Sequence, residues 1–522
     1  MTPADNFVRD VMARFGDFVG PGIQWQRALW DVGLVVALWE VREASDGVRN
    51  GALSNKALKR HADSVVKQIS RDPGAGDEQQ RKRLKHLLTQ DLSAEGVNYN
   101  ELSYWIEDVE RRFLARWRSA VVQTEKPGRE QVARALAAEL LRHELSPAFL
   151  HQWMRSLRDS STPIDADGLF ERAQALIASG PRVYEVMLPL ARPPSHRLAR
   201  PPEWREAQDV SHWFVRNGFE RVRQRGGFLF EVRARDPQAA AEIVAENADR
   251  LSARAAVGTR ETLEFLDRVF VEGEAKPMPA RRARRAEVRA LEREGTLLTA
   301  DAEGEVDQAL ELLSHLNTAA APVAAAAGWA AVESLLSGPG DKDKVVTADR
   351  LANLVACSWP RAELTTIAWA RVYQTDDSPD RLARELRNYQ TNRERADRVL
   401  SSLVNGEDLE LEWAAEKLAL GRMGSLRQSP RRELLAVRDR AGDALRRLYR
   451  ERNLVVHGGQ TAGFGLAGAL RAAAPLVGAG MDRLTHAAIV VAVRPLQLAG
   501  RAQQEIERAG TADAPPLTSL LE

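Results

Sequence analysis

The sequence contains a single cysteine, Cys357, and no long hydrophobic run. One cysteine cannot form an internal disulfide framework or a zinc site with several cysteine ligands, so we expect Cys357 to be a small buried apolar residue. The most apolar stretches, at 319–332 and 487–493, are too short to span a membrane, and the first residues lack the basic start and apolar core of a secretory signal. We therefore expect a cytoplasmic protein that has no membrane partner.

The sequence also lacks an excess of charge of either sign. Its 74 Lys and Arg residues are balanced by 73 Asp and Glu residues, for a net charge of +1. A global basic field that binds nucleic acid indiscriminately is thereby excluded, and any contact with nucleic acid has to be local. His143 and His151 are eight residues apart, and no cysteine or paired carboxylate completes a metal set around them, so we expect no metal and no other cofactor.

What the sequence has in abundance is the apolar spacing of amphipathic helices. At 522 residues with a hydrophobic fraction of 44%, the chain is long enough for two or three folded domains. We predict a mainly α fold made of an N-terminal helical region (1–178), a small α+β module (179–275), a basic linker or helix (276–304), a helical bundle (305–509) and a frayed tail (510–522).

Within the N-terminal region, the apolar residues between Ile23 and Val41 predict one mostly buried helix. Trp25, Trp30 and Trp39 lie in this stretch. They could form a platform on which nucleic-acid bases stack, but we favour their interpretation as core tryptophans of a buried helix.

Three short segments rich in strand-favouring residues predict the α+β module, at 182–190, 227–234 and 268–273. After the second segment, Asp236 and Pro237 predict the N-cap and first turn of a helix. The proline-rich sequence between the first two segments is expected to be an exposed loop.

A dense basic cluster made of Arg281, Arg282, Arg284 and Arg285 follows the module. It could be a phosphate-binding arm that contacts RNA, or the solvated start of a helix whose later glutamates pair with the arginines. Both interpretations stay open, and because the cluster lies at a domain boundary we keep it as a candidate RNA-binding site.

The densest group of reactive side chains lies at 452–459, which reads Arg-Asn-Leu-Val-Val-His-Gly-Gly. A step of four from the apolar residue Leu448 leads to Arg452, so we expect Arg452 to continue the buried face of the preceding helix and to meet an anionic group there. The glycine pair predicts that the helix ends beside His457.

Arg452 and His457 could then converge on one cleft. The arginine would offer a fixed cation for the transition state at phosphorus, and the imidazole could move a proton near neutral pH. These two groups are sufficient for RNA cleavage without a metal, in which the 2′-hydroxyl of the RNA is the nucleophile.

The pattern Arg452-Asn453-x3-His457, at the end of a long helix in an all-helical C-terminal domain, resembles the Arg-x4-6-His signature of HEPN-domain ribonucleases. The resemblance covers about residues 305–505. It implies a helical bundle that forms a homodimer, with two copies of the motif facing each other across one composite cleft. It further implies a metal-independent endoribonuclease, often a toxin or an effector of anti-phage defence (abortive infection) with a phage-derived trigger.

The same resemblance implies a role for each motif residue. Arg452 would stabilise the scissile phosphate of the RNA substrate, His457 would act as general acid or base, and Asn453 would orient the substrate or the histidine. Glu333 resembles the acidic residue that many members carry on a neighbouring helix. The N-terminal half would then recognise the trigger or hold the nuclease inactive.

Two interpretations from other classes remain. The chain could be a non-catalytic helical interaction or scaffold protein, in which Arg452 pairs with a core carboxylate and His457 caps its helix. It could also be a nucleic-acid-binding regulator that uses the cluster 281–285 together with Arg81 and Arg83.

Overall fold

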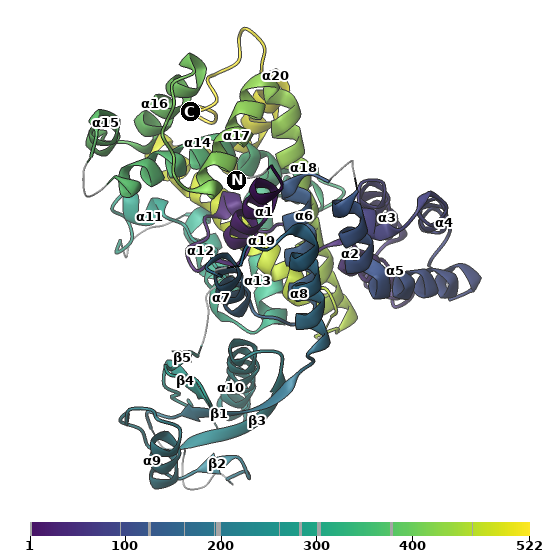
Figure 1. Ribbon diagram of the computed structural model, residues 1–522, viewed down its shortest axis with the longest axis vertical. Coiled ribbons are helices and arrows are strands. Elements are labelled where there is room, and N and C mark those ends of the chain that lie inside the picture. The colour runs from purple at the N-terminus through teal and green to yellow at the C-terminus, as the bar shows by residue number, and fades with distance from the viewer. Residues whose placement is uncertain are drawn as a thin grey trace.

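The structure is a computed structural model, and it describes most of the chain. The described residues are 3–93, 95–123, 127–160, 162–192, 194, 200–259, 262–280, 284–299, 304–375, 379–461 and 463–522, with only the backbone described at 3–5. The described chain is mainly helical with one small antiparallel sheet, as predicted. Figure 1 shows a large helical body, from which a smaller sheet module extends at one end.

The N-terminal region is helical throughout its described length, and its core is built from large apolar side chains such as Phe15, Phe113 and Phe170. Local signals set several helix starts, since Ser54 accepts a hydrogen bond from the Ala57 amide as an N-cap residue. The elements are α1 (Pro3–Val19), η1 (Trp25–Arg27), α2 (Leu34–Arg49), α3 (Asn55–Ile69), η2 (Pro73–Ala75), α4 (Glu78–Thr89), α5 (Val97–Val122), α6 (Arg129–Arg142), α7 (Pro147–Arg158) and α8 (Ala166–Ala178).

The prediction of one helix from Ile23 to Val41 is wrong. Only a single 3-10 turn forms at Trp25, and α2 does not begin until Leu34. Gly33 precedes α2 with a φ of +82°, a value that a right-handed helix does not allow. The tryptophans of this stretch therefore do not share a helix, and the Trp25 ring stacks on the Trp30 ring at 6.5 Å.

The sheet module confirms the three predicted strands and adds elements that were not predicted. Its sheet has the order β2-β3-β1-β4-β5 with antiparallel neighbours. The short strands β2 and β5 and the helix α9 were missed, and β5 extends the module to Pro279. The elements are β1 (Arg182–Pro189), β2 (Trp204–Arg205), α9 (Ala207–Arg216), β3 (Gly227–Ala234), α10 (Pro237–Thr259), β4 (Arg268–Val271) and β5 (Met278–Pro279).

The predicted cap of α10 is present. Asp236 Oδ1 accepts a hydrogen bond from the Ala239 amide at 2.9 Å, as an N-cap carboxylate should. Side chains of α10 such as Val244 pack on one face of the sheet, and side chains of α9 such as Phe214 pack on the other. The module thus has small apolar cores of its own.

The C-terminal bundle is built around α14, which packs against α16, α17, α18, α19 and α20. Cys357 lies on α14 and is buried as expected, and this burial raises the pKa of its thiol well above the usual range. The elements are α11 (Ala290–Arg293), α12 (Glu305–Thr318), α13 (Ala321–Leu336), α14 (Val346–Gln374), α15 (Arg381–Asn388), α16 (Asn392–Asn405), α17 (Ala414–Gln428), α18 (Pro430–Gly458), α19 (Leu466–His486), η3 (Ala487–Val491) and α20 (Pro495–Arg508).

The expectation of a frayed tail after residue 509 is wrong. Leu520 and Leu521 are buried in the bundle core. The Leu521 amide donates to Glu505 at 2.7 Å, and Arg483 donates to the Leu521 carbonyl. Two buried leucines and satisfied backbone groups hold this segment against α19 and α20.

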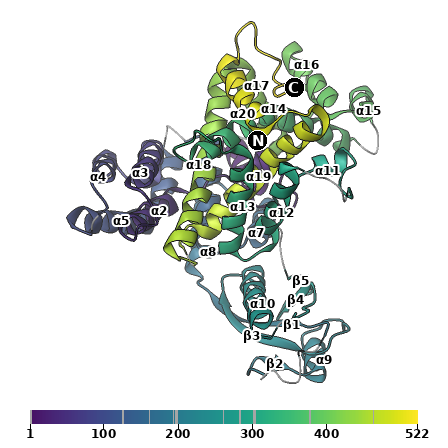
Figure 2. The same ribbon diagram turned by 180° about the vertical axis from the view of Figure 1, so that it is seen from behind.

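The N-terminal region and the bundle pack into one helical body, which Figure 2 shows from behind. Ala28 and Trp30 belong to the bundle core, while Leu454 of α18 belongs to the N-terminal core. Across this boundary the buried Arg27 pairs with Glu363 at 2.7 Å and with Glu416 at 2.6 Å. Each core therefore includes residues of the other region, and the boundary between the two also contains buried charges.

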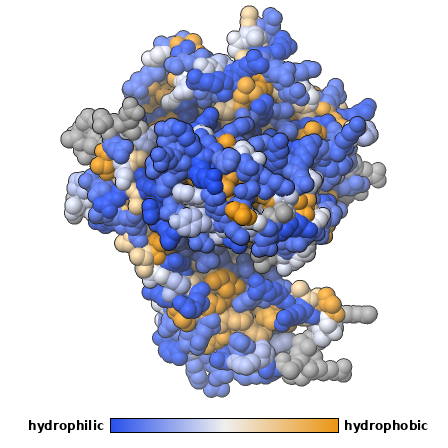
Figure 3. Space-filling view, turned by 90° about the vertical axis from the view of Figure 1, so that its right-hand side faces the viewer, coloured by the Kyte–Doolittle hydropathy of each residue, from blue (hydrophilic) through white to orange (hydrophobic). Residues whose placement is uncertain are grey.

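The face of the molecule in Figure 3 is mostly hydrophilic over the helical body, and apolar side chains gather on the sheet module below it. Among the described residues, no single helix is long and apolar enough to cross a membrane. One bent pair, Leu466–Val491 and Pro495–Arg508 at 111°, meets that test by length and composition only.

Candidate active site

The motif helix α18 passes from one core into the other. Leu434, Leu445 and Leu448 are buried in the bundle, whereas Leu454 is buried against the N-terminal region, so the C-terminal end of α18 lies beside α2 (Figure 1). A Cβ at Gly47 of α2 would lie 2.7 Å from Leu454 Cδ2. The absence of a side chain there lets α2 approach the motif closely.

The side chains of Arg452 and His457 meet at this helix end. Arg452 Nη1 lies 3.1 Å from His457 Nε2, and it donates to Asn453 Oδ1 at 2.9 Å. Because a guanidinium only donates, His457 Nε2 is the acceptor, which requires the tautomer with its proton on Nδ1. Asn453 is buried, Arg452 is half-buried and His457 is exposed. The motif thus consists of a buried amide, Asn453, that holds the Arg452 guanidinium beside the solvent-exposed imidazole of His457.

The glycine pair ends the helix beside the motif, as predicted. Gly459 adopts a left-handed conformation with a φ of +65°, and its amide donates to the Leu454 carbonyl. This is the usual way in which a glycine closes a helix. It leaves His457 in the last turn, five residues from Arg452 but within hydrogen-bonding distance of it.

The expectation that Arg452 continues the buried stripe of α18 is wrong. The stripe continues from Leu448 by a step of three to Glu451, which is 1% exposed, whereas Arg452 is half-buried. Steps of three and of four both follow one helix face, so the neighbours on α2 decide which residue is covered. Within the described residues, the partners of Arg452 are Asn453 and His457 and not a core carboxylate.

A buried group of charges, which sequence reasoning missed, lies behind the motif. Glu40 of α2 is fully buried and accepts hydrogen bonds from Arg447 Nε at 2.8 Å and 2.9 Å. Glu40 also pairs with Arg450 at 2.9 Å, and Arg450 lies 3.3 Å from Glu451. One carboxylate of the N-terminal region therefore holds two arginines in the turns of α18 that precede the motif.

Two acidic residues of this buried group have raised pKa values. Burial raises the pKa of Glu451 to about 8, although Arg450 opposes the shift. Burial likewise raises the pKa of Glu43, against the amide of Phe464. A proton on Glu451 lowers the negative charge beside the two buried arginines. An acidic residue within the apolar stretch of α2, at Glu40, was the sequence signal that could have revealed the group.

The loop after the motif is held by the same group of acids. The Phe464 amide donates to Glu43 Oε1 at 3.0 Å, and the Phe464 ring lies 5.9 Å from the Trp39 ring. Trp39, Glu43, Gln460 and Phe464 help to line a hollow of about 560 Å³. The N-terminal region thus contacts both the helix before the motif and the loop after it.

Glu333 lies on α13, which packs against α18. Its carboxylate accepts a hydrogen bond from the Trp329 indole at 2.8 Å and lies 3.7 Å from Lys344 Nζ. The Trp329 ring in turn lies 4.7 Å from the Tyr449 ring of α18. Among the described residues, Glu333 therefore reaches the motif helix through Trp329 and not by a contact with Arg452 or His457.

The basic cluster does not form a free arm where it is described. Arg284 donates to the carbonyls of Leu316 and Ala319, and burial lowers its pKa. Arg285 donates to the Pro21 carbonyl. The backbone from 284 to 289 is not helical, so the alternative of a solvated helix start is wrong here too. Arg281 and Arg282 lie outside the described residues.

Within the described residues, no group of three or more His, Cys, Asp or Glu side chains is arranged to hold a metal ion. The arrangement at the end of α18 is instead that of a proton carrier beside a fixed cation. Comparison of the chain with protein-family models, with curated proteins and with solved structures finds no match, so the site is interpreted from its own geometry.

Proposed function

We propose that the chain is a metal-independent endoribonuclease of the HEPN type, acting as a regulated effector in anti-phage defence in the cytoplasm. The observation that carries the proposal is the 3.1 Å contact between Arg452 Nη1 and His457 Nε2 at the solvent-facing end of a long helix. A guanidinium and an imidazole held this closely can act on one phosphodiester. The motif resemblance and the mainly helical fold support the same conclusion.

The proposed reaction uses the RNA as its own nucleophile. An entering phosphate attracts the Arg452 guanidinium away from the imidazole, which frees the Nε2 lone pair of His457. His457 then accepts the proton of the 2′-hydroxyl while the 2′-oxygen bonds to phosphorus and the bond to the 5′-oxygen breaks. Arg452 stabilises the charge on the phosphoryl oxygens, and the products are a 2′,3′-cyclic phosphate and a 5′-hydroxyl after a proton reaches the leaving oxygen.

The leaving 5′-oxygen needs an acid, and a second copy of the motif would supply it. In the proposed homodimer, the exposed ends of two α18 helices face one composite cleft, so that one His457 acts as base and the other as acid. Asn453 is buried beside Arg452 and sets the position of the guanidinium. The N-terminal half, which contacts α18 and the following loop, acts as sensor or regulator of this cleft.

The test is cleavage of total RNA by the full chain in EDTA. We expect cleavage by the unmodified protein, a loss of about 10²–10⁴-fold in rate for His457→Ala and of about 10²–10³-fold for Arg452→Ala. Intact RNA with the unmodified protein would count against the nuclease. Full activity in both variants would show that the site lies elsewhere.

Arg438→Ala is the matched control, because Arg438 lies on the same helix, is 38% exposed and pairs with the adjacent Asp439. It should cleave RNA at the unmodified rate. A second control is an RNA with 2′-deoxyribose at the cleaved position, which removes the nucleophile and should resist cleavage.

The alternative of a nucleic-acid-binding regulator has less support at its proposed basic residues. Arg284 and Arg285 donate to backbone carbonyls, and Arg83 pairs with Glu101. Strongly salt-dependent DNA binding that is lost when 281–285 is neutralised would favour this alternative over the nuclease.

A further inference from the structure

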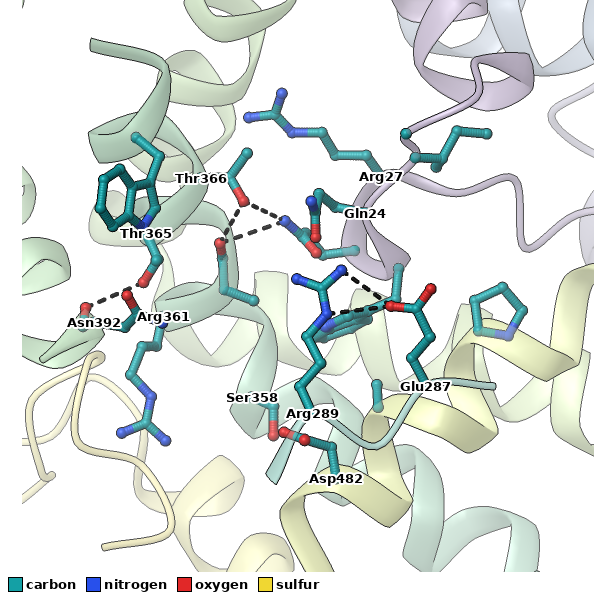
Figure 4. A pocket seen from close by; sticks show the side chains of 18 of the residues that line it. Gln24, Arg27, Glu287, Arg289, Ser358, Arg361, Thr365, Thr366, Asn392 and Asp482 are labelled. Carbon is teal, nitrogen blue, oxygen red and sulfur yellow. Dashed lines mark hydrogen bonds and ion pairs between the residues drawn. The ribbon is translucent and has the colours of Figure 1, made fainter. Parts of the chain in front are cut away.

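A large cavity lies between the N-terminal region and the bundle, away from the motif. Its volume is about 1320 Å³, which exceeds that of an ordinary small-molecule site. Its walls come from the segment after α1, the segment 285–294, the middle of α14, the start of α16 and α19, with Glu522 at one side. Figure 4 shows Arg361, Thr365 and Thr366 on α14 and Arg289 with Glu287 on another wall.

Three arginines line the Glu522 end of this cavity. Arg361 and Arg393 both form ion pairs with the Glu522 side chain, and Arg393 Nε is 3.7 Å from Asp397. The third is Arg483, which is 7% exposed. The three guanidinium groups outnumber the two carboxylates, those of Glu522 and Asp397, with which Arg361 and Arg393 form ion pairs.

Arg483 is the buried member of this arginine cluster, which we define as Arg361, Arg393 and Arg483. Burial, reinforced by the charge of Arg361, lowers the pKa of Arg483 to about 10. One of its nitrogens donates to the Leu521 carbonyl, whereas its buried Nε has no hydrogen-bond partner in the described structure. An unpaired donor in a buried cation is costly, and an additional anion would satisfy it.

The other carboxylates of the cavity wall are engaged with neighbours. Glu416 pairs with Arg27, Glu287 pairs with Arg289, and Glu294 pairs with Arg293 and His486. Asp482 accepts from the Ala290 amide at 2.6 Å and lies 3.7 Å from Arg293. Asp17 pairs with Arg14 at 3.1 Å. The arginine cluster is therefore the part of the wall best suited to bind an incoming anion.

Aromatic rings occupy the same face of α14 further along the cavity. Ser358, Arg361, Thr365, Trp369 and Tyr373 all line it at helical spacing. Eight residues separate Arg361 from Trp369, which is roughly 12 Å along the helix axis. Tyr373 stacks on Trp369 at 5.7 Å and is 62% exposed, so a planar group can reach much of its side chain.

We propose that this cavity binds a nucleoside polyphosphate, with its phosphates on the arginine cluster and its base against the Trp369–Tyr373 pair. The guanidinium groups match phosphate oxygens, and the aromatic pair gives a base a stacking surface. The separation along α14 is about the length of an extended nucleoside triphosphate. The hydroxyls of Thr365 and Thr366 lie on α14 between the two ends, where a ribose needs polar neighbours.

Glu522 takes the place of a ligand anion in this arrangement. Its carboxylate occupies Arg361 and Arg393, so a phosphate has to displace it or bind beside it against charge repulsion. The site therefore predicts opposite effects for two kinds of substitution. Removal of an arginine weakens phosphate binding, and neutralisation of Glu522 strengthens it. The proposal stands independently of RNA cleavage by the motif.

The test is titration of the full chain by calorimetry with ATP, GTP, CTP and UTP, beside inorganic triphosphate and adenosine. We expect saturable binding of at least one nucleoside triphosphate, and weaker binding of both triphosphate and adenosine. Arg393→Gln should weaken nucleotide and triphosphate by roughly tenfold, because charge-assisted hydrogen bonds are lost. Glu522→Gln should tighten both.

Tyr373→Ala separates the base from the phosphates. It should weaken nucleotide binding by roughly tenfold through lost stacking and leave inorganic triphosphate unchanged. Arg438→Gln, on the exposed face of α18, is the charge-matched control and should change nothing. Because Arg393 and Tyr373 are 49% and 62% exposed, these variants should fold, and thermal unfolding checks that they do.

Three results would overturn the proposal. The first is no saturation by any of the four nucleotides at millimolar concentration. The second is triphosphate binding as tight as nucleotide binding, which would assign the site to a simple anion. The third is nucleotide affinity that Arg393→Gln and Glu522→Gln leave unchanged, which would place the bound nucleotide outside this cavity.

Discussion

The N-terminal region and the sheet module are attached to the bundle in different ways. The N-terminal region and the bundle each place residues in the other's core, and Arg27, Glu363 and Glu416 are buried at their boundary. The sheet module has its own cores, and it contacts the helical body through hydrogen bonds in which buried Asp236 accepts from Ser146 and Arg235 donates to the Ile177 carbonyl. A region built into the core can set the geometry of a site, whereas a module on a narrow attachment can move as a unit.

The largest loss of stability should come from breaking the buried ion pairs between the N-terminal region and the bundle. Arg27→Ala leaves Glu363 and Glu416 buried without this partner, which should cost about 3–5 kcal/mol. We expect the N-terminal region and the bundle to lose stability together in denaturant unfolding. Arg83→Ala, which breaks an exposed pair with Glu101, should change the stability far less, because solvent screens that pair. Selective unfolding of the N-terminal helices alone would contradict cores that include residues of both regions.

The next largest loss of stability is expected where Asp236 of the sheet module contacts Ser146 of the helical body. Asp236 accepts from the Ser146 amide and hydroxyl, both at 2.7 Å, and caps α10. Asp236→Ala should therefore cost about 2–4 kcal/mol, as the sum of a lost cap and of charge-assisted hydrogen bonds. We expect faster hydrogen exchange at the starts of α7 and α10.

The exchange rates of α14 serve as the internal control for the same variant. They should not change, because α14 lies in the bundle core, away from this contact. Faster exchange throughout α14 would mean that the module and the helical body are one cooperative unit.

The buried acids and arginines between α2 and the motif helix should make the free energy of unfolding depend on pH. The pKa of Glu451 is raised in the folded chain from 4.5 to about 8, so the folded state holds a proton that the unfolded state releases above pH 4.5. The stability from this group is complete below about pH 4.5 and is lost as pH rises to about 8, at no more than about 1.4 kcal/mol per pH unit.

Glu451→Gln carries an amide in place of the protonated carboxyl. Relative to the unmodified chain, its free energy of unfolding should increase steadily from about pH 5 to pH 8 and then level off. Asp72, whose pKa burial raises to about 7, acts equally in both proteins and cancels in the difference. Parallel pH curves would show that Glu451 is not the titrating group.

The smallest effect is expected at the loop that follows the motif. Phe464 is 53% exposed and touches Trp39, so Phe464→Ala should cost less than about 1 kcal/mol. Its amide would still donate to Glu43. We expect faster hydrogen exchange at residues 463–465 with little change in unfolding, and a large loss of stability would mean that the ring contributes more than its exposure indicates.

The strands that the sequence predicted are those with enough residues to carry a pattern. β1 and β3 have eight residues each, and both are rich in strand-favouring side chains. Asp236 and Pro237 mark the start of the helix that follows β3. β2 and β5 have two residues each. A pair of residues has no periodicity, so only the neighbouring strands define these edges.

The stretch from Ile23 to Val41 shows how tertiary contacts override local pattern. Most of its apolar residues are buried, as the predicted helix would require, but Ala28 and Trp30 are buried by the bundle and not by a helix of their own. The sequence could indicate burial there but not the partner that causes it. Gly33 was the one local sign that the helix starts later.

The sequence predicted which residues form the candidate site, but not which face of α18 is buried beside it. The spacing of Arg452 and His457 and the glycines after them indicated a helix end where the two side chains meet. Which face of α18 is covered depends on α2, some 400 residues earlier in the chain. For the same reason the buried Glu451 and its partners could not be found from the residues around the motif alone.

Glu40 has an evolutionary consequence. It is a single carboxylate in α2 that holds Arg447 and Arg450 just before the motif. A substitution at any of these three positions changes the charge balance for the other two, so in descendants of this chain they should change as a set. A bundle transplanted into another protein would have to carry α2 with it, which makes these two distant helices a single inherited unit.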